Sequence, residues 1–230
     1  MNNKIVAISQ SNYIPWKGYF DMINMVDDFV LYDSVQYTKN DWRNRNKIKT
    51  KNGIQWITIP VRQKSLAQKI NETQISNSNW NKKHWKTLVT NYSKSKYFKE
   101  YRDIFEDLYL NCESNFLSEI NYKFIITINK ILNIKTNIIK SDKFNLPKEK
   151  NDKLIFICKK LGATTYLSGP AAKSYIDKSR FKEKKINITW MNYEGYKKYN
   201  QLFHPFEHNV SILDLIFNEG SNATKFMRSF

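Results

Sequence analysis

The sequence is poor in the residues that build metal sites, disulfide frameworks and flexible linkers. It has two cysteines, three histidines, six glycines and five prolines in 230 residues. Cys112 and Cys158 lie among apolar residues at helix-like spacing, which predicts two small core side chains. His204 and His208 are four residues apart, but Pro205 follows the first and no third ligand is near in sequence. We therefore expect no metal, no cofactor and no redox chemistry.

Long apolar runs and acidic residues are also scarce. No run approaches the roughly 20 residues of a transmembrane helix, and the stretch from Lys4 to Ile8 is too short for a signal peptide. We therefore expect a cytoplasmic protein with no membrane span. Hydrophobic residues make up 41% of the chain, which excludes a disordered protein. The 38 Lys and Arg residues outnumber 21 Asp and Glu residues, and a net charge of +17 favours a polyanionic partner.

The hydrophobic pattern predicts an α/β fold. Short apolar segments rich in β-branched residues alternate with segments whose apolar residues recur every three or four positions. We expect strands near residues 4–8, 29–32, 54–61, 136–141, 163–167 and 186–190. Ser211 predicts a capping box with Asp214, and Pro170 predicts a helix start. The expected architecture is a largely parallel sheet with flanking helices and a helical insertion at roughly 80–133, in one domain spanning 1–230.

The most basic segment runs from residue 39 to residue 51 and holds six basic residues and one acidic residue. Arg or Lys stands at every second position from 43 to 51, and an extended chain would place these side chains on one face about 7 Å apart. Such a row favours a bound anion such as a diphosphate. The alternative is a solvated edge strand protected by its lysines from pairing. Trp42 would add a stacking surface.

Two further basic clusters lie at 82–102 and 173–185. The first has seven basic residues against one acidic residue, with Trp80, Trp85 and Tyr92 interleaved, and the second has six against two. Each cluster alone is typical of a solvated helix face. Together they favour a polyanionic ligand.

Polar and aromatic residues follow the first two predicted strands, at the edge where ligands bind in parallel α/β sheets. Asn12, Tyr13 and Trp16 offer an amide, a phenol and an indole, which suit a sugar or a nucleotide. Asp33 follows the second strand and would point into the same crevice as a general base or as a partner of a substrate amine. The alternatives are an ordinary strand-to-helix turn and an exposed capping aspartate.

Two weaker candidates lie further along the chain. Ser168 and Gly169 precede Pro170 at a predicted strand-to-helix junction, where free backbone N–H groups favour an anion. His84 lies between Lys83 and Trp85, and nearby cations should keep it neutral and able to accept a proton.

A series of ordered motifs resembles the WbqC-like protein family over nearly the whole chain. The motifs are Gln10–Phe20, Leu31–Lys39, Trp42–Lys49, Gly53–Val61, Lys83–Lys86, Tyr166–Gly169, Tyr175–Asp177 and Ser211–Gly220. Gln10, Gln36, Lys39, Asn44 and Asn46 lie in these motifs and are further candidate binding residues. In the first loop His-Gln-Pro is common in the family, whereas Ser9-Gln10-Ser11 stands here. A catalytic histidine at position 9 is thereby excluded.

The resemblance implies a role in surface polysaccharide synthesis, because such proteins are encoded beside genes for glycans whose amino sugars carry amide-linked acyl or aminoacyl groups. The leading hypothesis is an N-acyl or N-aminoacyl transferase, for example a glycyl transferase, acting on a nucleotide-linked amino sugar. The donor would be an aminoacyl-tRNA, an acyl-CoA or a free amino acid, and the sequence leaves this choice and the oligomeric state open. We expect the diphosphate to lie against Arg43, Arg45 and Lys47.

The remaining roles follow from the same hypothesis. The base or sugar would lie against Tyr13, Trp16 and Trp42. Either Asp33 or His84 would take the proton of the amine.

One alternative is a glycosyltransferase or nucleotidyltransferase with the same sugar-nucleotide pocket, which would need paired carboxylates to hold a divalent metal. Asp27 and Asp28 precede the second predicted strand and Asp33 follows it, so the strand separates them and they do not form the expected pair. The other is a non-catalytic nucleic-acid-binding module.

Overall fold

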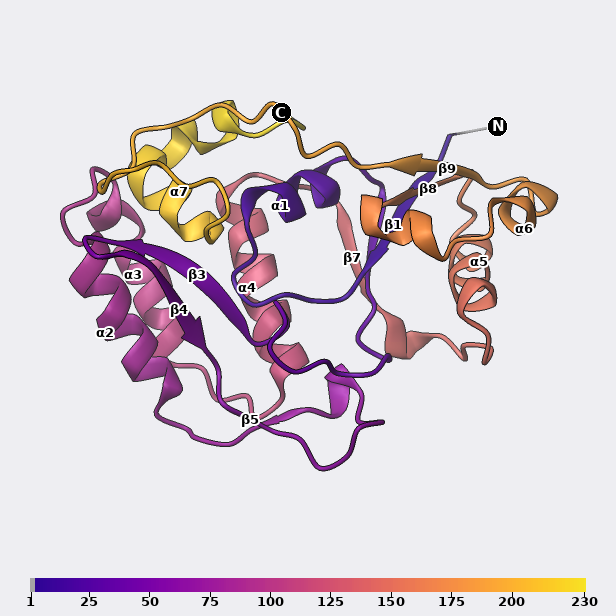
Figure 1. Ribbon diagram of the computed structural model, residues 1–230, viewed down its shortest axis with the longest axis horizontal. Coiled ribbons are helices and arrows are strands. Elements are labelled where there is room, and N and C mark those ends of the chain that lie inside the picture. Colours follow the sequence, from indigo (N-terminus) through magenta and orange to yellow (C-terminus); the bar gives the residue numbers. More distant parts are fainter. Residues whose placement is uncertain (1–2) are drawn as a thin grey trace.

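A five-stranded, all-parallel sheet forms the centre of the computed structural model, which describes residues 3–230 (Figure 1). The strand order is β7-β2-β1-β8-β9. The strands are β1 (Ile5–Ser9), β2 (Asp28–Leu31), β7 (Asn137–Lys140), β8 (Thr165–Ser168) and β9 (Asn187–Trp190). The predicted α/β class and parallel sheet are confirmed.

The central strand β1 explains the short apolar segment at the start of the chain. It pairs with β2 on one side and β8 on the other, so that Ala7 is opposite both Phe29 and Leu167. Val6 and Ala7 are fully buried, because helices cover both faces of the sheet. The chain builds outward in one direction through β2 and β7, and then in the other through β8 and β9. The strand order therefore reverses between β1 and β8.

The helices cover the two faces of the sheet unequally. They are α1 (Lys17–Asn24), α2 (Trp80–Tyr92), α3 (Phe98–Leu110), α4 (Leu117–Ile131), α5 (Lys150–Lys160), α6 (Lys178–Glu183) and α7 (Ile212–Glu219). Ala7 belongs to the larger apolar core, which also contains Phe20, Phe124 and Phe217 from α1, α4 and α7. Its neighbours on β1 point the other way, into a smaller core against α5 and α6.

A hairpin of β3 (Arg45–Thr50) and β4 (Gly53–Thr58) stands apart from the main sheet and packs beside α2 and α7 (Figure 1). Gly53 has φ +102° in the turn, a conformation that side chains rarely adopt. Ile48 and Ile57 face the larger core. The segment after the hairpin is less irregular than its polar sequence suggests, since β5 (Val61–Arg62) pairs with β6 (Gln74–Ile75).

Two predicted helix starts need correction. Pro170 begins a 3-10 helix, Pro170–Ser174, instead of an α-helix. Ser211 does cap α7 by accepting from the N–H of Leu213, but no capping box forms with Asp214. The carboxylate of Asp214 instead accepts hydrogen bonds from other buried groups, which hold it away from the helix end.

Between β9 and α7, residues 191–210 contain no helix or strand, and we call this segment the strap. It crosses the outside of α1 and α7 (Figure 1). Lys17 of α1 lies under it, with Nζ 4.8 Å from the ring centroid of Tyr196 and 5.2 Å from that of Tyr199. The strap is therefore held by cation–π contacts as well as by apolar packing.

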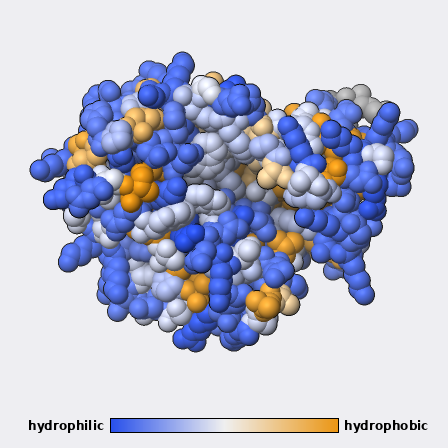
Figure 2. Space-filling model, in the orientation of Figure 1, coloured by the Kyte–Doolittle hydropathy of each residue, from blue (hydrophilic) through white to orange (hydrophobic). Residues whose placement is uncertain are grey.

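The face of the molecule in Figure 2 is dominated by hydrophilic residues, with apolar residues in small separate groups. Across residues 3–230, every helix is too short or too polar to cross a membrane.

Candidate functional site

A cleft of about 800 Å³ lies at the carboxyl ends of β1, β2 and β8. Ser9 and Gln10 reach it from β1, Tyr32 from β2, and Ser168 and Gly169 from β8. This is where the strand order reverses, and the two connections leaving β1 and β8 diverge there and leave a crevice. The cleft therefore lies where the fold class places its ligand site.

Aromatic rings and two lysines dominate the walls of the cleft. The rings belong to Trp16, Tyr19, Tyr32, Trp42, Tyr166, Tyr175 and Tyr193. Lys150 and Lys153 face it from the start of α5, and Nζ of Lys150 lies 3.3 Å from the ring centroid of Tyr175. Flat rings suit a base or a sugar, and ammonium groups suit a phosphate. The cleft therefore combines stacking surfaces with two cations.

Gly18 determines the position of Trp16. A Cβ atom at Gly18 would lie 2.4 Å from Cζ2 of the indole, so only glycine lets the ring lie this close to α1. On its other side the indole packs against Tyr193 and Tyr196 of the strap, at centroid distances of 5.1 and 5.5 Å. Trp16 is thus a fixed part of the cleft wall.

A second cavity of about 300 Å³, which we call the side pocket, adjoins the cleft. Its walls are Asn12, Pro15, Trp16, Trp42, Asn46, Lys47 and Asn209. Asn12, Trp16 and Trp42 line both cavities. These three side chains therefore form the boundary between two adjacent binding volumes.

Arg43 orients Asn12 at this boundary. Its guanidinium donates to the side-chain oxygen of Asn12 and, at 3.4 Å, to the backbone oxygens of both Gln10 and Ser11. Because a guanidinium only donates, the oxygen of Asn12 faces Arg43 and its amide nitrogen is left for a ligand. The expectation that Arg43 binds a diphosphate needs correction, since its side chain is largely buried and serves the loop instead.

The loop that carries Asn12 is strained at its next turn. Ile14 has φ +38°, which is unfavourable for a β-branched residue and costs about 1–3 kcal/mol. The amide of Asn46 donates to the oxygens of Tyr13 and Ile14, at 3.1 and 2.9 Å, and holds this conformation. Asn44 is likewise structural, because its amide donates to the oxygen of Ile59 at 2.8 Å. Both asparagines support the site from within the fold.

The predicted row of five cations is wrong. Only Arg45, Lys47 and Lys49 share a face of β3. Lys49 is 3% exposed and donates to the oxygen of Pro205 in the strap. Lys51 lies in the hairpin turn. Two cations, Arg45 and Lys47, remain accessible on this face.

Tyr13 and His84 do not reach either cavity. Tyr13 is fully buried, and its hydroxyl lies 2.9 Å from Nδ1 of His84 and 2.7 Å from the hydroxyl of Tyr109. Nε2 of His84 lies 3.2 Å from the oxygen of Thr58, and burial lowers the pKa of His84 to about 4. The expectations of a ligand-binding Tyr13 and a proton-accepting His84 at the cleft are thus corrected.

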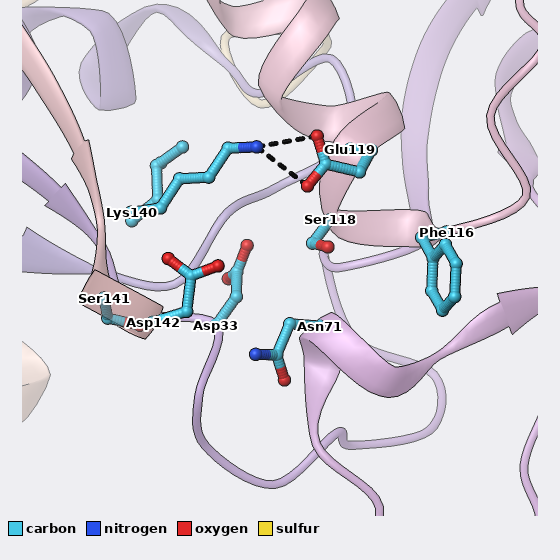
Figure 3. Close-up of a pocket in the computed structure, with 9 residues that line it drawn as sticks. Asp33, Asn71, Phe116, Ser118, Glu119, Lys140, Ser141 and Asp142 are labelled. Atoms are coloured by element: carbon cyan, nitrogen blue, oxygen red, sulfur yellow. Dashed lines mark hydrogen bonds and ion pairs between the residues drawn. The ribbon is translucent and has the colours of Figure 1, made fainter. Parts of the chain in front are cut away.

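Asp33 opens into a separate cavity of about 180 Å³ between the ends of β2 and β7 and the start of α4 (Figure 3). The carboxyl groups of Asp33 and Asp142 both point into it, beside an ion pair of Lys140 with Glu119 at 2.7 Å. Burial raises the pKa of Asp33 to about 6, although the N–H of Ser11, at 2.8 Å, partly offsets that rise. Asp33 supports the loop at Ser11 and does not share the cleft, contrary to expectation.

The other predicted residues divide between the cleft and the surface. Gln36, Ser168 and Gly169 line the cleft, and the amide of Gln36 donates to the oxygen of Leu66. The 3-10 turn after Gly169 lacks the helix N-terminus on which the predicted anion site depended. Lys39 is exposed in a turn outside the cavities.

The two basic clusters differ in their aromatic neighbours, because the second contains Tyr175, which is exposed and borders the cleft. The seven cations at 82–102 are all exposed, whereas Trp80, Trp85 and Tyr92 are buried in the larger core. In the cluster at 173–185, Arg180 is paired with Glu149 and Asp152. The first cluster therefore contributes positive potential over α2 and α3.

Sequence reasoning missed several residues of the cleft. Tyr32 could have been found, because it follows the second strand at the same edge as Asp33. Tyr175 lies in the family motif Tyr175–Asp177, but nothing in the sequence alone places it beside Lys150. Lys153 and Tyr193 reach the cleft from segments that are distant in sequence, and no local signal marks them.

Comparison with known proteins agrees with the motifs. A model of the WbqC-like protein family matches residues 10–226. The chain belongs to the WbqC-like protein family. This WbqC-like chain is also 47% identical over 226 residues to the uncharacterized protein Rv1507c of Mycobacterium tuberculosis, covering 98% of each chain. No solved structure matches it.

Within residues 3–230 of this WbqC-like chain, no three His, Cys, Asp or Glu side chains are grouped so that they could hold a metal ion. Asp27 and Asp28 lie at the amino end of β2, the edge of the sheet opposite the cleft. There Asp27 accepts from the N–H of Ile5 at 2.7 Å, and Asp28 pairs with Lys4. These carboxylates hold the sheet edge.

Proposed function

We propose that this protein transfers an acyl or aminoacyl group to the amine of a nucleotide-linked amino sugar. The supporting observation is the pair of cavities that meet at Asn12, Trp16 and Trp42. A group transfer between two bound substrates needs two such volumes with a common boundary. The larger cleft has the size and lining for the nucleotide sugar, and the side pocket would take the acyl end of the donor.

The cleft supplies the diphosphate with cations other than those expected from the sequence. Lys150 and Lys153 would hold the phosphates, since both face the cleft from the first turn of α5. The rings of Trp16, Tyr175 and Tyr193 would hold the base and the sugar. The lysines of α5 thus take the role that the sequence suggested for Arg43.

In the proposed reaction the amine nitrogen attacks the carbonyl carbon of the donor. A C–N bond forms, the bond to the oxygen of a tRNA ester or the sulfur of a CoA thioester breaks, and the amine proton ends on that leaving group. The free amide nitrogen of Asn12 would donate to the carbonyl oxygen as negative charge develops there. Asp33 and His84 take no direct part in this reaction. Asp33 positions Ser11, and His84 supports the core.

The reaction belongs, on this proposal, to surface polysaccharide synthesis in the cytoplasm, before the sugar enters a glycan. A metal-dependent glycosyltransferase or nucleotidyltransferase is less well supported, because Asp27 and Asp28 lie at the edge of the sheet opposite the cleft. A metal-holding carboxylate pair would have to lie beside the diphosphate.

The test is to incubate the protein with UDP-linked amino sugars and either charged tRNA or acetyl-CoA, and to search for the amide product by mass spectrometry. Asn12→Ala should lower kcat by about 100-fold or more if its amide stabilises the developing charge. No product with either donor would contradict the proposal.

Two lysines of α5 provide a matched pair for the binding step. Lys153 lines the cleft, whereas Lys159 is exposed at the other end of the same helix. Lys153→Ala should weaken binding of the UDP-sugar by roughly 10-fold, as expected for the loss of one charge-assisted contact of about 1.5 kcal/mol. Lys159→Ala should bind as the wild type does. Isothermal titration calorimetry measures the affinity of both variants for the UDP-sugar.

A further inference from the structure

Two tryptophans on the hairpin side of the side pocket are exposed to solvent. Trp42 is 39% exposed and Trp56 is 40% exposed, although most other large aromatic side chains of the protein are buried. Their ring centroids lie 5.2 Å apart with an interplanar angle of 36°. Exposed apolar side chains that gather in one place mark an interaction site more often than scattered ones do.

Two cations are placed over these rings by the register of the hairpin. Lys47 is directly opposite Trp56, and Arg45 is diagonal to it on the same face. The guanidinium carbon of Arg45 lies 4.3 Å from the Trp56 centroid. Nζ of Lys47 lies 5.2 Å from the centroid of Trp56 and 5.8 Å from that of Trp42. We call these four side chains the platform.

The platform leads into the side pocket. Trp42 and Lys47 belong to both, and Trp42 also borders the cleft. One end of a ligand bound on the platform would therefore reach Asn12, at the boundary between the side pocket and the cleft. The packing of α2 beside the hairpin places its exposed lysines, Lys82, Lys83 and Lys86, on a neighbouring element.

From this arrangement we infer that the platform and the side pocket bind the single-stranded 3′ end of an RNA, whose terminal nucleotide carries the group to be transferred. Aromatic rings that alternate with cations are the means by which proteins bind single-stranded nucleic acid, because bases stack and phosphates pair. The net charge of +17 and the exposed lysines favour a long polyanion over a small thioester. The role of the RNA as donor rests on the proposed function.

The test measures binding of a short fluorescent single-stranded RNA ending in CCA by anisotropy. Trp56→Ala is the decisive variant, because Trp56 belongs to the platform but lines neither cavity. It should lower the affinity by roughly 5- to 100-fold, the effect of losing one base–aromatic stack. Trp56→Phe should keep most of the affinity. Leu66→Ala, which removes an exposed apolar side chain elsewhere, should bind as the wild type does.

Salt and competitors complete the test. Affinity should fall steeply with salt, and duplex RNA should compete poorly because its bases are not free to stack. Unchanged RNA affinity in Trp56→Ala, or Trp56-dependent binding of acetyl-CoA without RNA binding, would overturn the inference. Titration of the wild type with a UDP-linked amino sugar is the separate check on the proposed function. Failure there, with Trp56-dependent RNA binding intact, would remove only the transferase role.

Discussion

Tyr13 donates its hydroxyl hydrogen to Nδ1 of His84 across 2.9 Å in the fully enclosed part of the larger core. The direction follows from the other nitrogen, because Nε2 faces the oxygen of Thr58 and must donate to it. The hydroxyl of Tyr109 then donates to the oxygen of Tyr13. Three buried polar side chains thus satisfy one another only while His84 is neutral.

This relationship predicts acid sensitivity. Burial lowers the pKa of His84 to about 4 from an ordinary 6.5, so the unfolded chain binds the proton more tightly than the folded one. Stability from this residue is complete above pH 6.5 and is lost as the pH falls towards 4, by at most about 3 kcal/mol. The free energy of unfolding, measured with urea, should depend less on pH over this range in His84→Gln than in the wild type. His204→Gln, at an exposed histidine, is the control, and equal slopes for all three proteins would contradict the prediction.

A second prediction concerns the close contact of Gly18 with Trp16. Gly18→Ala would place a methyl group 2.4 Å from the indole, and the ring would have to leave the wall of both cavities. We expect a loss of about 1–3 kcal/mol in stability from overpacking, together with weaker binding of the UDP-sugar. Gly169→Ala is the steric control for stability, because its new methyl would meet no atom nearer than 3.9 Å. Equal stability of Gly18→Ala and the wild type would show that Trp16 is free to move.

The fold was predictable because its strands carry a local signal. The strand segments at residues 4–8, 29–32, 163–167 and 186–190 all correspond to strands, since buried parallel strands require short runs of β-branched and aromatic residues. The same pattern also indicated the edge of the sheet at which the cleft lies. The helix starts were harder: Asp214 has the spacing of a capping box, but tertiary hydrogen bonds use its carboxylate instead.

The site was only partly predictable, because polarity does not reveal which way a side chain points. Asn12 and Trp16 border both cavities as their loop position suggested, while Tyr13 between them is buried. The basic pattern of the sequence suggested Arg43 and Lys49 as phosphate ligands. In the structure both side chains donate to backbone oxygens of other segments. Lys153 and Tyr193 join the cleft through the crossover geometry of the sheet, which local spacing does not encode.

The third prediction concerns Asp33, whose contribution to stability changes with pH in the opposite direction to that of His84. Burial raises its pKa to about 6 from an ordinary 3.8, so its contribution to stability is greatest below pH 3.8 and is lost as the pH rises through 6. Asp33→Asn should therefore raise the free energy of unfolding by about 1–2 kcal/mol at neutral pH and change it little near pH 4. The same measurement on Asp103→Asn, an exposed carboxylate of α3, should show no such gain. A less stable Asp33→Asn at neutral pH would mean that the bond to Ser11 and the charge of Arg43 outweigh the cost of burial.

The last prediction concerns Asp214, which binds two residues of the strap. Its buried carboxylate accepts from the hydroxyls of Tyr92 and Tyr199, at 2.9 and 2.7 Å, and from the amide of Gln201 at 2.9 Å. Asp214→Ala leaves the buried hydroxyls of Tyr92 and Tyr199 without an acceptor, while the amide of Gln201 keeps the oxygen of Glu207, and should cost about 3–5 kcal/mol. Tyr199→Phe removes one donor and should cost about 1 kcal/mol.

The readout that separates this coupling from simple destabilisation is ligand affinity in a variant that stays folded. The strap contributes Tyr193 to the cleft and Asn209 to the side pocket, so loosening it should weaken UDP-sugar binding. Tyr199→Phe at low temperature should show several-fold weaker binding by titration calorimetry, while Asp103→Asn should bind normally. Wild-type affinity in Tyr199→Phe would mean that Trp16 and Lys17 hold the strap in place without this hydrogen bond, and that the carboxylate of Asp214 serves the stability of the core alone.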